Sequence, residues 1–432
     1  MNTWLIITHN FLILHRSKNL LNFYMKVLYI TYDGLLDPLG SSQILPYLYG
    51  LNDSSRFIFI ISVEKSNRYK ANYSALRDEL SKKNIYWKPL LFSKKFGIFG
   101  KLWDFYKMYY SAIKLSAFYK IDTVHARGHV AAQVASFLKS LFNIKFIFDF
   151  RGLWADERVD KGGWNLDKTI DRVQYKFFKN KEKKLLSHAD QAIVLTNKVV
   201  KEVCKISDIN SNQITVIPCC ADFEHFSLQT KKTKAKIKKQ LEISENSLVF
   251  GFLGSVGSMY LLEDYLRLIE LIHLKYQSRD IDIFGLIITN DLQKAQDAKN
   301  NTLPQELKEK TLVLSASREE VPKLLHSLDV LISFITSTYA RQGASPTKIA
   351  ESFACGIPVI SNKGIGDVED QVNAINGGKV INDTSIESLK EITLGLDQVL
   401  LLDRNKIRCK AEEFLSLDIA IERYKDVYSK LM

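Results

Sequence analysis

The sequence predicts an α/β protein built from two Rossmann-like domains that face a central cleft, and three observations support this prediction. Short runs of β-branched and aromatic residues alternate with longer segments of helical apolar spacing, which is typical of parallel βαβ units. A polar, lysine-rich stretch at 229–240 interrupts this alternation near the middle of the chain. The length of 432 residues suits two or three domains of roughly 150 residues each, and two is the simpler interpretation.

The first half of the chain contains six runs that we expect to form strands. Each run is short and rich in β-branched and aromatic residues, and apolar residues recur at helical spacing between the runs. The expected strands are 26–32, 57–63, 85–92, 123–126, 146–150 and 192–196. The expected helices between them are 43–52, 69–83, 102–119, 130–141 and 166–187.

The second half repeats this pattern and completes the predicted organisation. Its expected strands are 248–253, 281–288, 311–314, 330–334 and 359–360, and a last helix at 410–430 could pack back across the first domain. We therefore predict an N-terminal extension at 1–25, a first domain at 26–216, a linker at 217–245, a second domain at 246–408 and a C-terminal helix at 409–432. Ligands bind beyond the carboxyl ends of parallel strands, so the cleft between two such domains is the expected active site.

The excess of positive charge belongs to the first half of the chain alone. The formal net charge is +12, but residues 1–200 carry 31 Lys and Arg against 16 Asp and Glu, and the remainder carries 29 against 32. An excess of +15 in one half indicates a polyanionic partner for it, such as anionic lipid headgroups or a phosphorylated substrate. A lysine-rich solvated surface is the equally weighted alternative. We expect no nucleic-acid partner, because no zinc, RNP-type or helix-turn-helix signature occurs.

The sequence predicts neither a metal site nor a membrane-spanning segment. The five cysteines show no C-x-x-C spacing, which fits a reducing cytosol and argues against structural zinc. Asp280 and Asp282 mimic a D-x-D metal motif, but they begin an expected strand and have no supporting ligand. The first apolar run, 4–14, is too short to span a bilayer and lacks the features of a signal peptide. Residues 1–24 are interpreted as an upstream-start extension or a small membrane-seeking arm.

The segment with the clearest chemistry is the expected helix that begins near Ser345. Ser345 is a natural N-cap, Pro346 suits the first helical position, and Gly356 with the proline that follows should end the helix. The free amides of a helix N-terminus bind anions, and Lys348 in the first turn adds a positive charge. Glu351, one turn further on, could accept hydrogen bonds from a ribose hydroxyl pair. A merely well-capped helix is an equally good interpretation of this segment taken alone.

Four segments resemble one enzyme family. Residues 345–361 read S-P-T-K-I-A-E-S-F-A-C-G-I-P-V-I-S and are similar to the nucleotide-sugar helix of glycosyltransferase family 4, whose members are retaining enzymes of the GT-B fold. Segments 32–47, 149–158 and 216–226 resemble the N-terminal domain and the interdomain segment of the same family. The matches follow the family's order from residue 26 to about 375. The resemblance implies transfer of a sugar from a nucleotide diphosphate donor with retained configuration and without a metal or other cofactor.

The resemblance implies a donor site in the second domain and contains one departure. Many members carry two glutamates separated by seven residues, and Glu351 matches the second, whereas Gly343 stands in place of the first, which normally lies near the donor sugar. The loop at 251–258 supplies glycines that let backbone amides approach a diphosphate. It lacks the Arg and Lys that often follow it in the family, so charge must come from elsewhere. The candidate donor-binding residues are Gly254, Ser255, Gly257, Ser258, Arg341, Ser345, Thr347, Lys348 and Glu351.

Candidate residues in the first domain follow its expected strands and turns. His125 and Arg127 lie at the end of one strand, where they could hold the donor sugar or the leaving phosphate, although a strand-end histidine is often only packing. Asp156 follows the next strand and could assist deprotonation, or could be an ordinary loop charge. The candidate catalytic residues are therefore His125, Arg127 and Asp156, and the candidate acceptor and cleft residues are Gly40, Ser41, Arg151 and Glu157.

The predicted function is that of a retaining glycosyltransferase which builds a cell-surface glycan. Its expected partners are a nucleotide diphosphate sugar, a lipid-linked glycan acceptor and an anionic membrane, and its expected location is the cytoplasm or the inner face of the membrane. Helix 101–120 mixes Lys with many aromatic residues and could rest on a membrane surface, or could be an ordinary amphipathic helix with its aromatics inward. A non-catalytic nucleotide-sugar-binding subunit and a sugar-nucleotide epimerase are the alternatives.

Overall fold

The computed structural model of the chain describes residues 25–53, 55–93, 97–257 and 259–432. The predicted extension before residue 25 and the candidate residue Ser258 lie outside the described residues. The chain divides into two compact units. The first unit holds the described residues up to Phe150 together with Lys184–Ile193 and Tyr424–Met432, and the second holds Arg151–Lys183 and Val194–Arg423. Residues 151–183 thus group with the second unit, although the sequence places them in the first domain.

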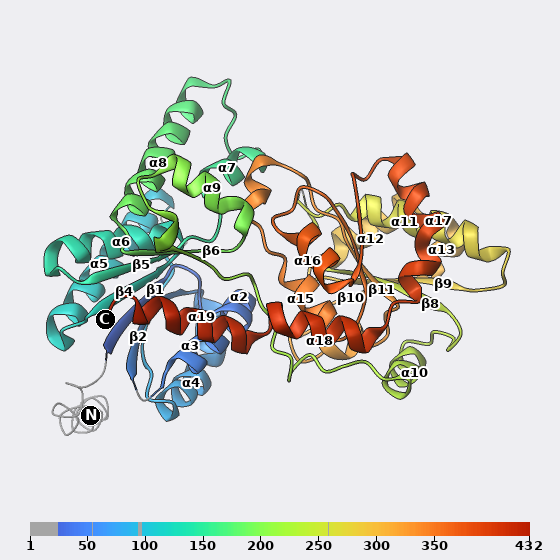
Figure 1. Cartoon of the computed structure of the whole chain (residues 1–432), viewed down its shortest axis with the longest axis horizontal. Coiled ribbons are helices and arrows are strands. Elements are labelled where there is room, and N and C mark those ends of the chain that lie inside the picture. The colour runs from blue at the N-terminus through green and yellow to red at the C-terminus, as the bar shows by residue number, and fades with distance from the viewer. Residues whose placement is uncertain (1–24, 54, 94–96, 258) are drawn as a thin grey trace. The chain divides into compact units, whose positions relative to one another are not determined.

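A parallel sheet of seven strands, in the order β3-β2-β1-β4-β5-β6-β7, begins in the first unit (Figure 1). Buried runs of Val, Ile, Leu and Phe form its central strands, as expected for a sheet covered on both faces. The order reverses between β1 and β4, which makes their carboxyl ends a switch point. The strands are β1 (Met25–Thr31), β2 (Arg56–Glu64), β3 (Tyr86–Leu91), β4 (Thr123–Arg127), β5 (Lys145–Asp149), β6 (Gln191–Val194) and β7 (Ile214–Val216).

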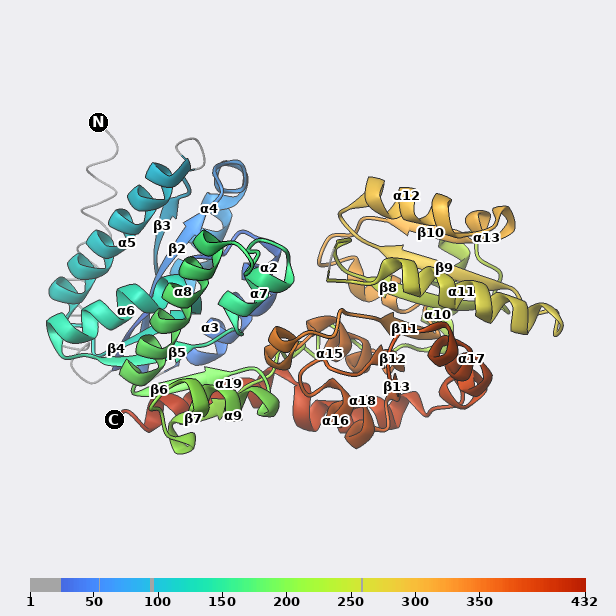
Figure 2. The same ribbon diagram turned by 90° about the horizontal axis from the view of Figure 1, so that it is seen from above.

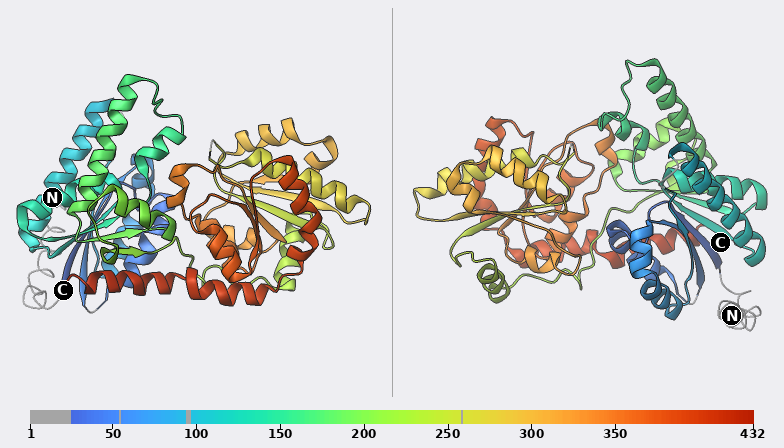
Figure 3. Two further views of the ribbon diagram at one scale, coloured as in Figure 1. Left: turned by 45° about the horizontal axis from the view of Figure 1, so that its top comes forward. Right: turned by 180° about the vertical axis from the view of Figure 1, so that it is seen from behind.

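Helices connect these strands, as is usual for the crossovers between parallel strands. Among them, α5 and α6 pack against each other and lie side by side in the views of Figure 3. The helices before β7 are α2 (Pro38–Gln43), α3 (Leu45–Leu51), α4 (Ser66–Lys82), α5 (Gly97–Tyr119), α6 (Gly128–Phe142), α7 (Trp154–Asp160), α8 (Thr169–His188) and α9 (Asn197–Ile206).

A second parallel sheet of six strands lies in the second unit, in the order β10-β9-β8-β11-β12-β13. Its order reverses between β8 and β11, so the loops that follow these two strands flank the switch point of the second sheet. The strands are β8 (Leu248–Leu253), β9 (Ile283–Ile288), β10 (Thr311–Leu314), β11 (Val330–Ser333), β12 (Val359–Asn362) and β13 (Gly378–Ile381).

Successive residues of the second sheet feed two separate apolar cores, because side chains of a strand alternate between its faces. Val249 joins a core with α15, α16 and α18, whereas Phe250 joins a core with α11 and α17 on the other face (Figure 2). The helices of this region are α10 (Lys231–Gln240), α11 (Leu262–Gln277), α12 (Leu292–Thr302), α13 (Gln305–Glu309), α14 (Val321–Leu325), α15 (Thr347–Ala354), α16 (Val368–Ile375), α17 (Ile386–Leu400), α18 (Arg404–Leu415) and α19 (Leu417–Ser429).

The structure confirms the predicted α/β class with two parallel sheets and corrects several elements. The single helix expected at 43–52 is two short helices, α2 and α3. The expected linker contains α10, and the last helix is broken into α18 and α19. This break has a visible cause: Ala221 N–H donates to Leu415 O at 2.9 Å, and Leu417 N–H donates to Ala221 O at 2.8 Å. Residue 221 therefore pairs with the backbone on either side of Ser416. In a continuous helix these backbone groups would bond to each other along the helix, so the pairing interrupts it.

Candidate functional site

The helix α15 begins one residue later than the sequence predicts. Pro346, not Ser345, is the N-cap, and Thr347 is the first helical residue. Ser345 fails to cap the helix because its hydroxyl oxygen accepts a hydrogen bond from Cys219 N–H at 3.0 Å. At the other end Gly356 has a φ of +72°, the left-handed conformation that ends helices. Thr347 and Lys348 thus occupy the first turn of α15, at the switch point of the second sheet.

Lys348 is a buried cation in contact with aromatic rings. Its side chain is 8% exposed, and Nζ lies 3.8 Å from the ring centre of Tyr260 and 5.4 Å from that of Phe252. Nζ makes no hydrogen bond within the described part of the chain. The φ of Gly254 is +136°, a conformation that favours glycine, and a Cβ there would lie 2.6 Å from Nζ. Burial lowers the pKa of Lys348 to about 7, although the nearby Glu351 opposes this shift.

Glu351 lies one turn after Lys348 and has the opposite response to the same environment. Burial raises the pKa of Glu351 to about 7, while the positive charges of Arg318 and Lys348 act in the other direction. An acid and a base that both titrate near neutrality can each gain or lose a proton when a charged ligand arrives. The first two turns of α15 are therefore responsive to an anion.

Arg341 is a second buried cation, on the 3₁₀ helix η4 (Tyr339–Gly343) that follows β11. The residue is 5% exposed. Its Nη2 donates to the sulfur of Met259 at 2.9 Å, its Nη1 lies 4.0 Å from Glu157 Oε1, and its Nε has no hydrogen-bond partner among the described residues. A thioether is a weak acceptor, so the guanidinium has one weak hydrogen bond and one buried donor, Nε, without a partner among the described residues. Unsatisfied donors of a buried cation are costly unless a ligand supplies oxygens.

The glycine loop after β8 lies between β8 and α11 and contains the remaining donor candidates. Ser255 and Gly257 are exposed, and a Cβ on Gly257 would meet nothing within 4 Å. Asp291 holds the loop, since Val256 N–H donates to its carboxylate at 2.8 Å. The loop is therefore anchored by its backbone and open at Gly257. Together with Lys348 and Arg341, it forms a site that can bind an anion with several oxygens.

The structure explains why residue 343 is glycine. A Cβ at Gly343 would lie 3.2 Å from Gly152 Cα and 3.7 Å from Leu153 N, with Val199 also in contact. The backbone that follows β5 thus fills the space into which a side chain at 343 would extend. A glutamate, which the resembling family often carries here, does not fit unless this backbone moves.

In the first unit, His125 and Arg127 lie together at the switch point between β1 and β4, and both are buried. His125 Nδ1 and the Tyr428 hydroxyl on α19 are hydrogen-bonded at 2.6 Å, and His125 Nε2 lies 4.0 Å from Asp149. Arg127 Nη1 donates to Asp149 at 3.3 Å, and its Nε lies 3.9 Å from Asp33. His125 is therefore engaged by the C-terminal helix, while Arg127 is oriented by carboxylates at the sheet edge.

Asp156 and Glu157 are neighbours on α7 with different surroundings. Asp156 is buried and accepts from the Tyr175 hydroxyl at 2.7 Å and from Lys179 at 2.9 Å. It therefore holds α7 to α8 through both carboxylate oxygens. Glu157 is 24% exposed in its side chain and pairs with Lys161 at 2.8 Å. A base that abstracts a proton needs an accessible oxygen. Glu157 has such an oxygen, whereas both carboxylate oxygens of Asp156 accept hydrogen bonds from Tyr175 and Lys179.

The other cleft candidates have mainly structural contacts. Arg151 Nη2 donates to Cys219 Sγ at 3.3 Å. Gly40 lies in α2, where a Cβ would come within 2.2 Å of Gly34 O, so a close backbone approach requires this glycine. Ser41 Oγ donates to Pro38 O at 3.1 Å. These residues shape the turn before α2 and the segment before α7.

Four residues that the sequence did not identify contact the predicted site residues. Met259, Tyr260 and Phe252 surround Arg341 and Lys348, and Tyr428 engages His125. An aromatic or methionine next to a strand is more often core than site, so the pattern gives no signal for the first three. A signal for Tyr428 existed, since we expected the last helix to return to the first domain, but periodicity cannot name its partner.

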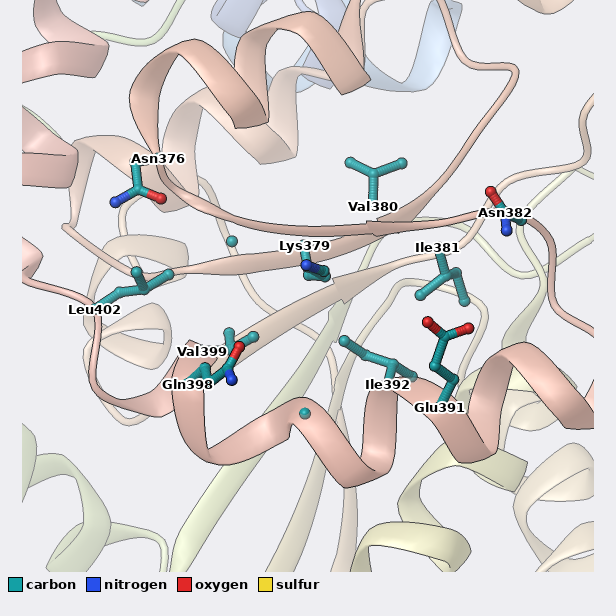
Figure 4. A pocket seen from close by; sticks show the side chains of 12 residues that line it. Asn376, Lys379, Val380, Ile381, Asn382, Glu391, Ile392, Gln398, Val399 and Leu402 are labelled. Carbon is teal, nitrogen blue, oxygen red and sulfur yellow. The ribbon is translucent and has the colours of Figure 1, made fainter.

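The described residues contain neither a group of three or more His, Cys, Asp or Glu that could hold a metal ion nor a helix with the length and apolarity needed to cross a bilayer. A cavity of about 490 Å³ lies between the edge strand β13 and α17, with Lys379, Asn382, Glu391 and Gln398 in its lining. Figure 4 shows the carboxylate of Glu391 pointing from α17 toward β13. None of the predicted site residues lines this cavity, so it is separate from the Lys348 site.

Two protein-family models match the chain. The model described as Glycosyltransferase Family 4 matches residues 70–225, and the model described as Glycosyl transferases group 1 matches residues 233–410. Together they cover most of the chain. No curated protein matches it in sequence.

Solved structures align with nearly the whole chain at low identity. A glycosyltransferase from Rickettsia africae is 16% identical with a TM-score of 0.68, and the alignment covers 94% of this chain and 98% of that one. HepE from Anabaena, in complex with UDP and glucose, is 13% identical with a TM-score of 0.64 and coverage of 94% and 100%. WaaG, a glycosyltransferase involved in lipopolysaccharide biosynthesis, is 12% identical with a TM-score of 0.66 and coverage of 93% and 99%. At these identities the likeness shows the GT-B fold.

Proposed function

The chain belongs to glycosyltransferase family 4, and from this we propose that it transfers a sugar from a nucleotide diphosphate donor, bound by the second unit, to a glycan acceptor. One observation carries the donor assignment. Lys348 and Arg341 are both buried beside the glycine loop, and neither has a carboxylate within hydrogen-bond distance. Two such cations at a switch point suit a diphosphate, whose oxygens would satisfy their donors. HepE, which shares the fold, binds UDP and UDP-glucose.

We place the nucleotide along the first turns of α15. The diphosphate would lie between Lys348 and Arg341 and face the exposed glycine of the loop, Gly257. Glu351, one helical turn behind Lys348, would accept hydrogen bonds from the ribose hydroxyls. The φ of +136° at Gly254 favours glycine, and Nζ of Lys348 lies beside this residue. The two cations and the N-terminal dipole of α15 supply the positive charge, so the proposal needs no metal.

We propose that the reaction retains the configuration of the donor carbon by front-face transfer. The bond from the anomeric carbon to the diphosphate oxygen breaks, the acceptor hydroxyl oxygen bonds to that carbon on the same face, and the hydroxyl proton passes to the departing phosphate oxygen. Lys348 and Arg341 would stabilise the charge that develops on this oxygen. The protein then supplies orientation and charge and needs no strong base. The engagement of Asp156 by Tyr175 and Lys179 is compatible with this mechanism.

We assign the acceptor to the first unit. Arg127, positioned by Asp149 and close to Asp33, lies at the carboxyl edge of β1 and β4, where it can donate to acceptor hydroxyls. Its guanidinium is pre-oriented there, which reduces the entropy lost on binding. His125 supports the same edge through its hydrogen bond to Tyr428. We do not assign it a catalytic contact.

We further propose a lipid-linked glycan acceptor at the inner face of a membrane, with α5 as the membrane contact. Trp103, Tyr106 and Tyr110 on α5 are each 56% exposed, and their rings stack along the helix. An outward aromatic stripe with exposed Lys101 and Lys114 on the same helix is unlike an ordinary amphipathic helix, which turns its aromatics inward. Such a surface suits anionic headgroups. The excess positive charge of the first half of the chain also favours binding to anionic headgroups.

A donor screen followed by a transfer assay tests the proposal. Nucleotide sugars of uridine, guanosine and adenosine are compared by thermal shift, because a ligand raises the unfolding temperature according to its affinity. The best donor is then incubated with lipid-linked glycans, and the released nucleoside diphosphate is measured. Acceptor-dependent release supports the proposal. Tight donor binding without transfer or hydrolysis would support a non-catalytic subunit, and conversion of the donor without acceptor would support an epimerase.

A further inference from the structure

A carboxylate oxygen without a hydrogen bond lies beside the cation cluster of the second unit. Glu157 Oε2 accepts from Lys161 at 2.8 Å, whereas Oε1 accepts no hydrogen bond from any described residue. Arg341 Nη1 lies 4.0 Å from Oε1, which is too long for a direct hydrogen bond. Because the side chain is 24% exposed, a ligand can reach this oxygen.

Arg341 presents unused donors to the same space. Its Nε has no partner among the described residues, and within the same part of the chain its guanidinium donates only to the sulfur of Met259. The side chain is 6% exposed, so bulk water satisfies little of it. A free acceptor and free donors therefore face each other across a short gap.

The gap has the size of one hydroxyl group. A hydroxyl donates one hydrogen bond and accepts others, so it can donate to Glu157 Oε1 and accept from Arg341 at once. An oxygen at an ordinary distance of about 2.8 Å from each partner spans a separation of 4.0 Å. An anion placed in this gap itself, in contact with Glu157 Oε1, would be repelled by the carboxylate. The pair thus prefers a neutral polyol to a second anion.

The backbone around residue 152 builds this pair into the site. Gly343 leaves room for the backbone of Gly152 and Leu153, and α7 begins directly after it. Gly152 has a φ of +132°, and a Cβ there would lie 3.3 Å from Glu157 Oε1. Glycine at both 152 and 343 therefore lets α7 bring its carboxylate to Arg341.

We infer that Glu157 and Arg341 together bind one hydroxyl of the sugar carried by the donor, with Glu157 as the acceptor of the hydrogen bond and Arg341 as the donor. The sequence suggested a role for Glu157 toward the acceptor glycan, whereas its position beside Arg341 assigns it to the donor side. The inference rests on the proposed function, because it needs a nucleotide sugar at Lys348. It identifies Glu157 as a specificity-determining residue.

Calorimetric titration separates this role from a role in diphosphate binding. The full chain is titrated with UDP, GDP and ADP and with UDP-glucose, UDP-galactose, GDP-mannose and ADP-glucose, and the best matched pair is kept. Glu157→Gln and Glu157→Ala should weaken binding of the nucleotide sugar by roughly tenfold or more, as expected for a lost hydrogen bond to a charged group. Binding of the matching nucleoside diphosphate should change less than about twofold.

Lys161→Gln is the matched control, because it removes the other partner of Glu157 and leaves Oε1 in place. It should leave both affinities unchanged. The inference is overturned if the Glu157 variants weaken both ligands equally, if they weaken neither, or if Lys161→Gln reproduces their effect. Circular dichroism confirms that each variant is folded. Failure of the wild type to bind any nucleoside diphosphate would instead refute the proposed function on which the inference rests.

Deoxy analogues of the bound nucleotide sugar provide a second measurement. Removal of the hydroxyl that Glu157 binds should weaken wild-type binding, and the same removal should cost Glu157→Ala little, because the interaction is already lost. Additive losses for every deoxy position would contradict the inference. A non-additive loss at one position would name the hydroxyl.

Discussion

Lys348 is the residue whose protonation we expect to couple to ligand binding. Its pKa is lowered to about 7 by burial, so it is charged below pH 7 and increasingly neutral above it. A diphosphate favours the charged form. Binding should therefore take up a proton at pH 7–8, and the affinity for the diphosphate should fall as the pH rises above 7.

Titration calorimetry in two buffers of different ionisation enthalpy measures this proton uptake. Lys348→Met should reduce the uptake, to which Glu351 can still contribute, and should weaken the nucleoside diphosphate by about 10-fold or more, while the free nucleoside is affected less. The same proton uptake in Lys348→Met as in the wild type would show that another group titrates.

Gly343 tests the packing explanation for the departure from the family motif. Gly343→Ala should destabilise the fold by roughly 1–3 kcal/mol, because its Cβ would be 3.2 Å from Gly152 Cα and overpacks the contact. Chemical denaturation measures this change. Gly395→Ala is the matched control, because Gly395 lies in α17 and a Cβ there would meet no atom within 4 Å. This substitution should stabilise the fold by about 0.5–1 kcal/mol. Equal effects of the two substitutions would contradict the explanation.

At the residue scale, the sequence predicts contacts within one local motif and misses contacts between residues that are far apart in the chain. Lys348 and Glu351 are one turn apart in a single helix, so their proximity follows from sequence spacing. The contact of Tyr260 with Lys348 and the approach of Glu157 to Arg341 join segments about 90 and 180 positions apart. No periodicity encodes such contacts.

At the scale of elements, α7 is held to α8 by Asp156. Asp156→Asn should destabilise the protein by about 1.5–3 kcal/mol, because it weakens charge-assisted hydrogen bonds from Lys179 and Tyr175 to a buried carboxylate. Thermal or urea unfolding measures the loss. Asp297→Asn changes an exposed carboxylate on α12 that accepts a hydrogen bond from Gln293, and its effect should stay within about 0.5 kcal/mol. A loss at Asp156 as small as that at Asp297 would contradict the role of this contact.

The helix α19 is expected to stabilise the first unit through Tyr428. Tyr428 is fully buried, and its hydroxyl is hydrogen-bonded to His125. Tyr428→Phe should lower the free energy of unfolding by roughly 1–2 kcal/mol, since it removes this hydrogen bond without leaving a large cavity. Urea denaturation of the full chain measures the change, and an unchanged free energy would show that the hydrogen bond is not stabilising.

Strands with a continuous apolar run were predicted well, whereas two short strands without such a run were missed. The predicted strands correspond to β1 to β6 and β8 to β12, because buried parallel strands have continuous apolar runs. The strands β7 and β13 have three and four residues and no such run. The break between α18 and α19 depends on pairing with residue 221, which lies about 200 positions away. Tertiary contacts decide these elements.

At the scale of the whole molecule, the charge asymmetry gives a prediction about membranes. We expect the full chain to cosediment with phosphatidylglycerol vesicles, less with phosphatidylcholine vesicles, and less at high salt. The combined substitution of Trp103, Tyr106 and Tyr110 by Ala should reduce binding by about tenfold or more, since the aromatic area buried in the interface is lost. Leu394→Ala removes an apolar residue of α17 that is 78% exposed and should not change vesicle binding. Equal losses would contradict a membrane role for α5.

The alternation of strands and helices was sufficient to predict the fold class, because it fixes parallel units and two sheets. It could not predict that residues 151–183 group with the second unit. That grouping depends on contacts such as Thr338 with Asp160 at 2.6 Å, between side chains far apart in the sequence. The resemblance to the family supplied the chemistry that the pattern alone left open.

A crystal structure of the full chain with the nucleoside diphosphate that binds best tests the central claim most directly. We predict that diphosphate oxygens lie within hydrogen-bond distance of Lys348 Nζ and of the Arg341 guanidinium, and that the ribose hydroxyls donate to Glu351. Nucleotide bound elsewhere, such as in the cavity between β13 and α17, with Lys348 and Arg341 still lacking an anionic partner, would contradict it.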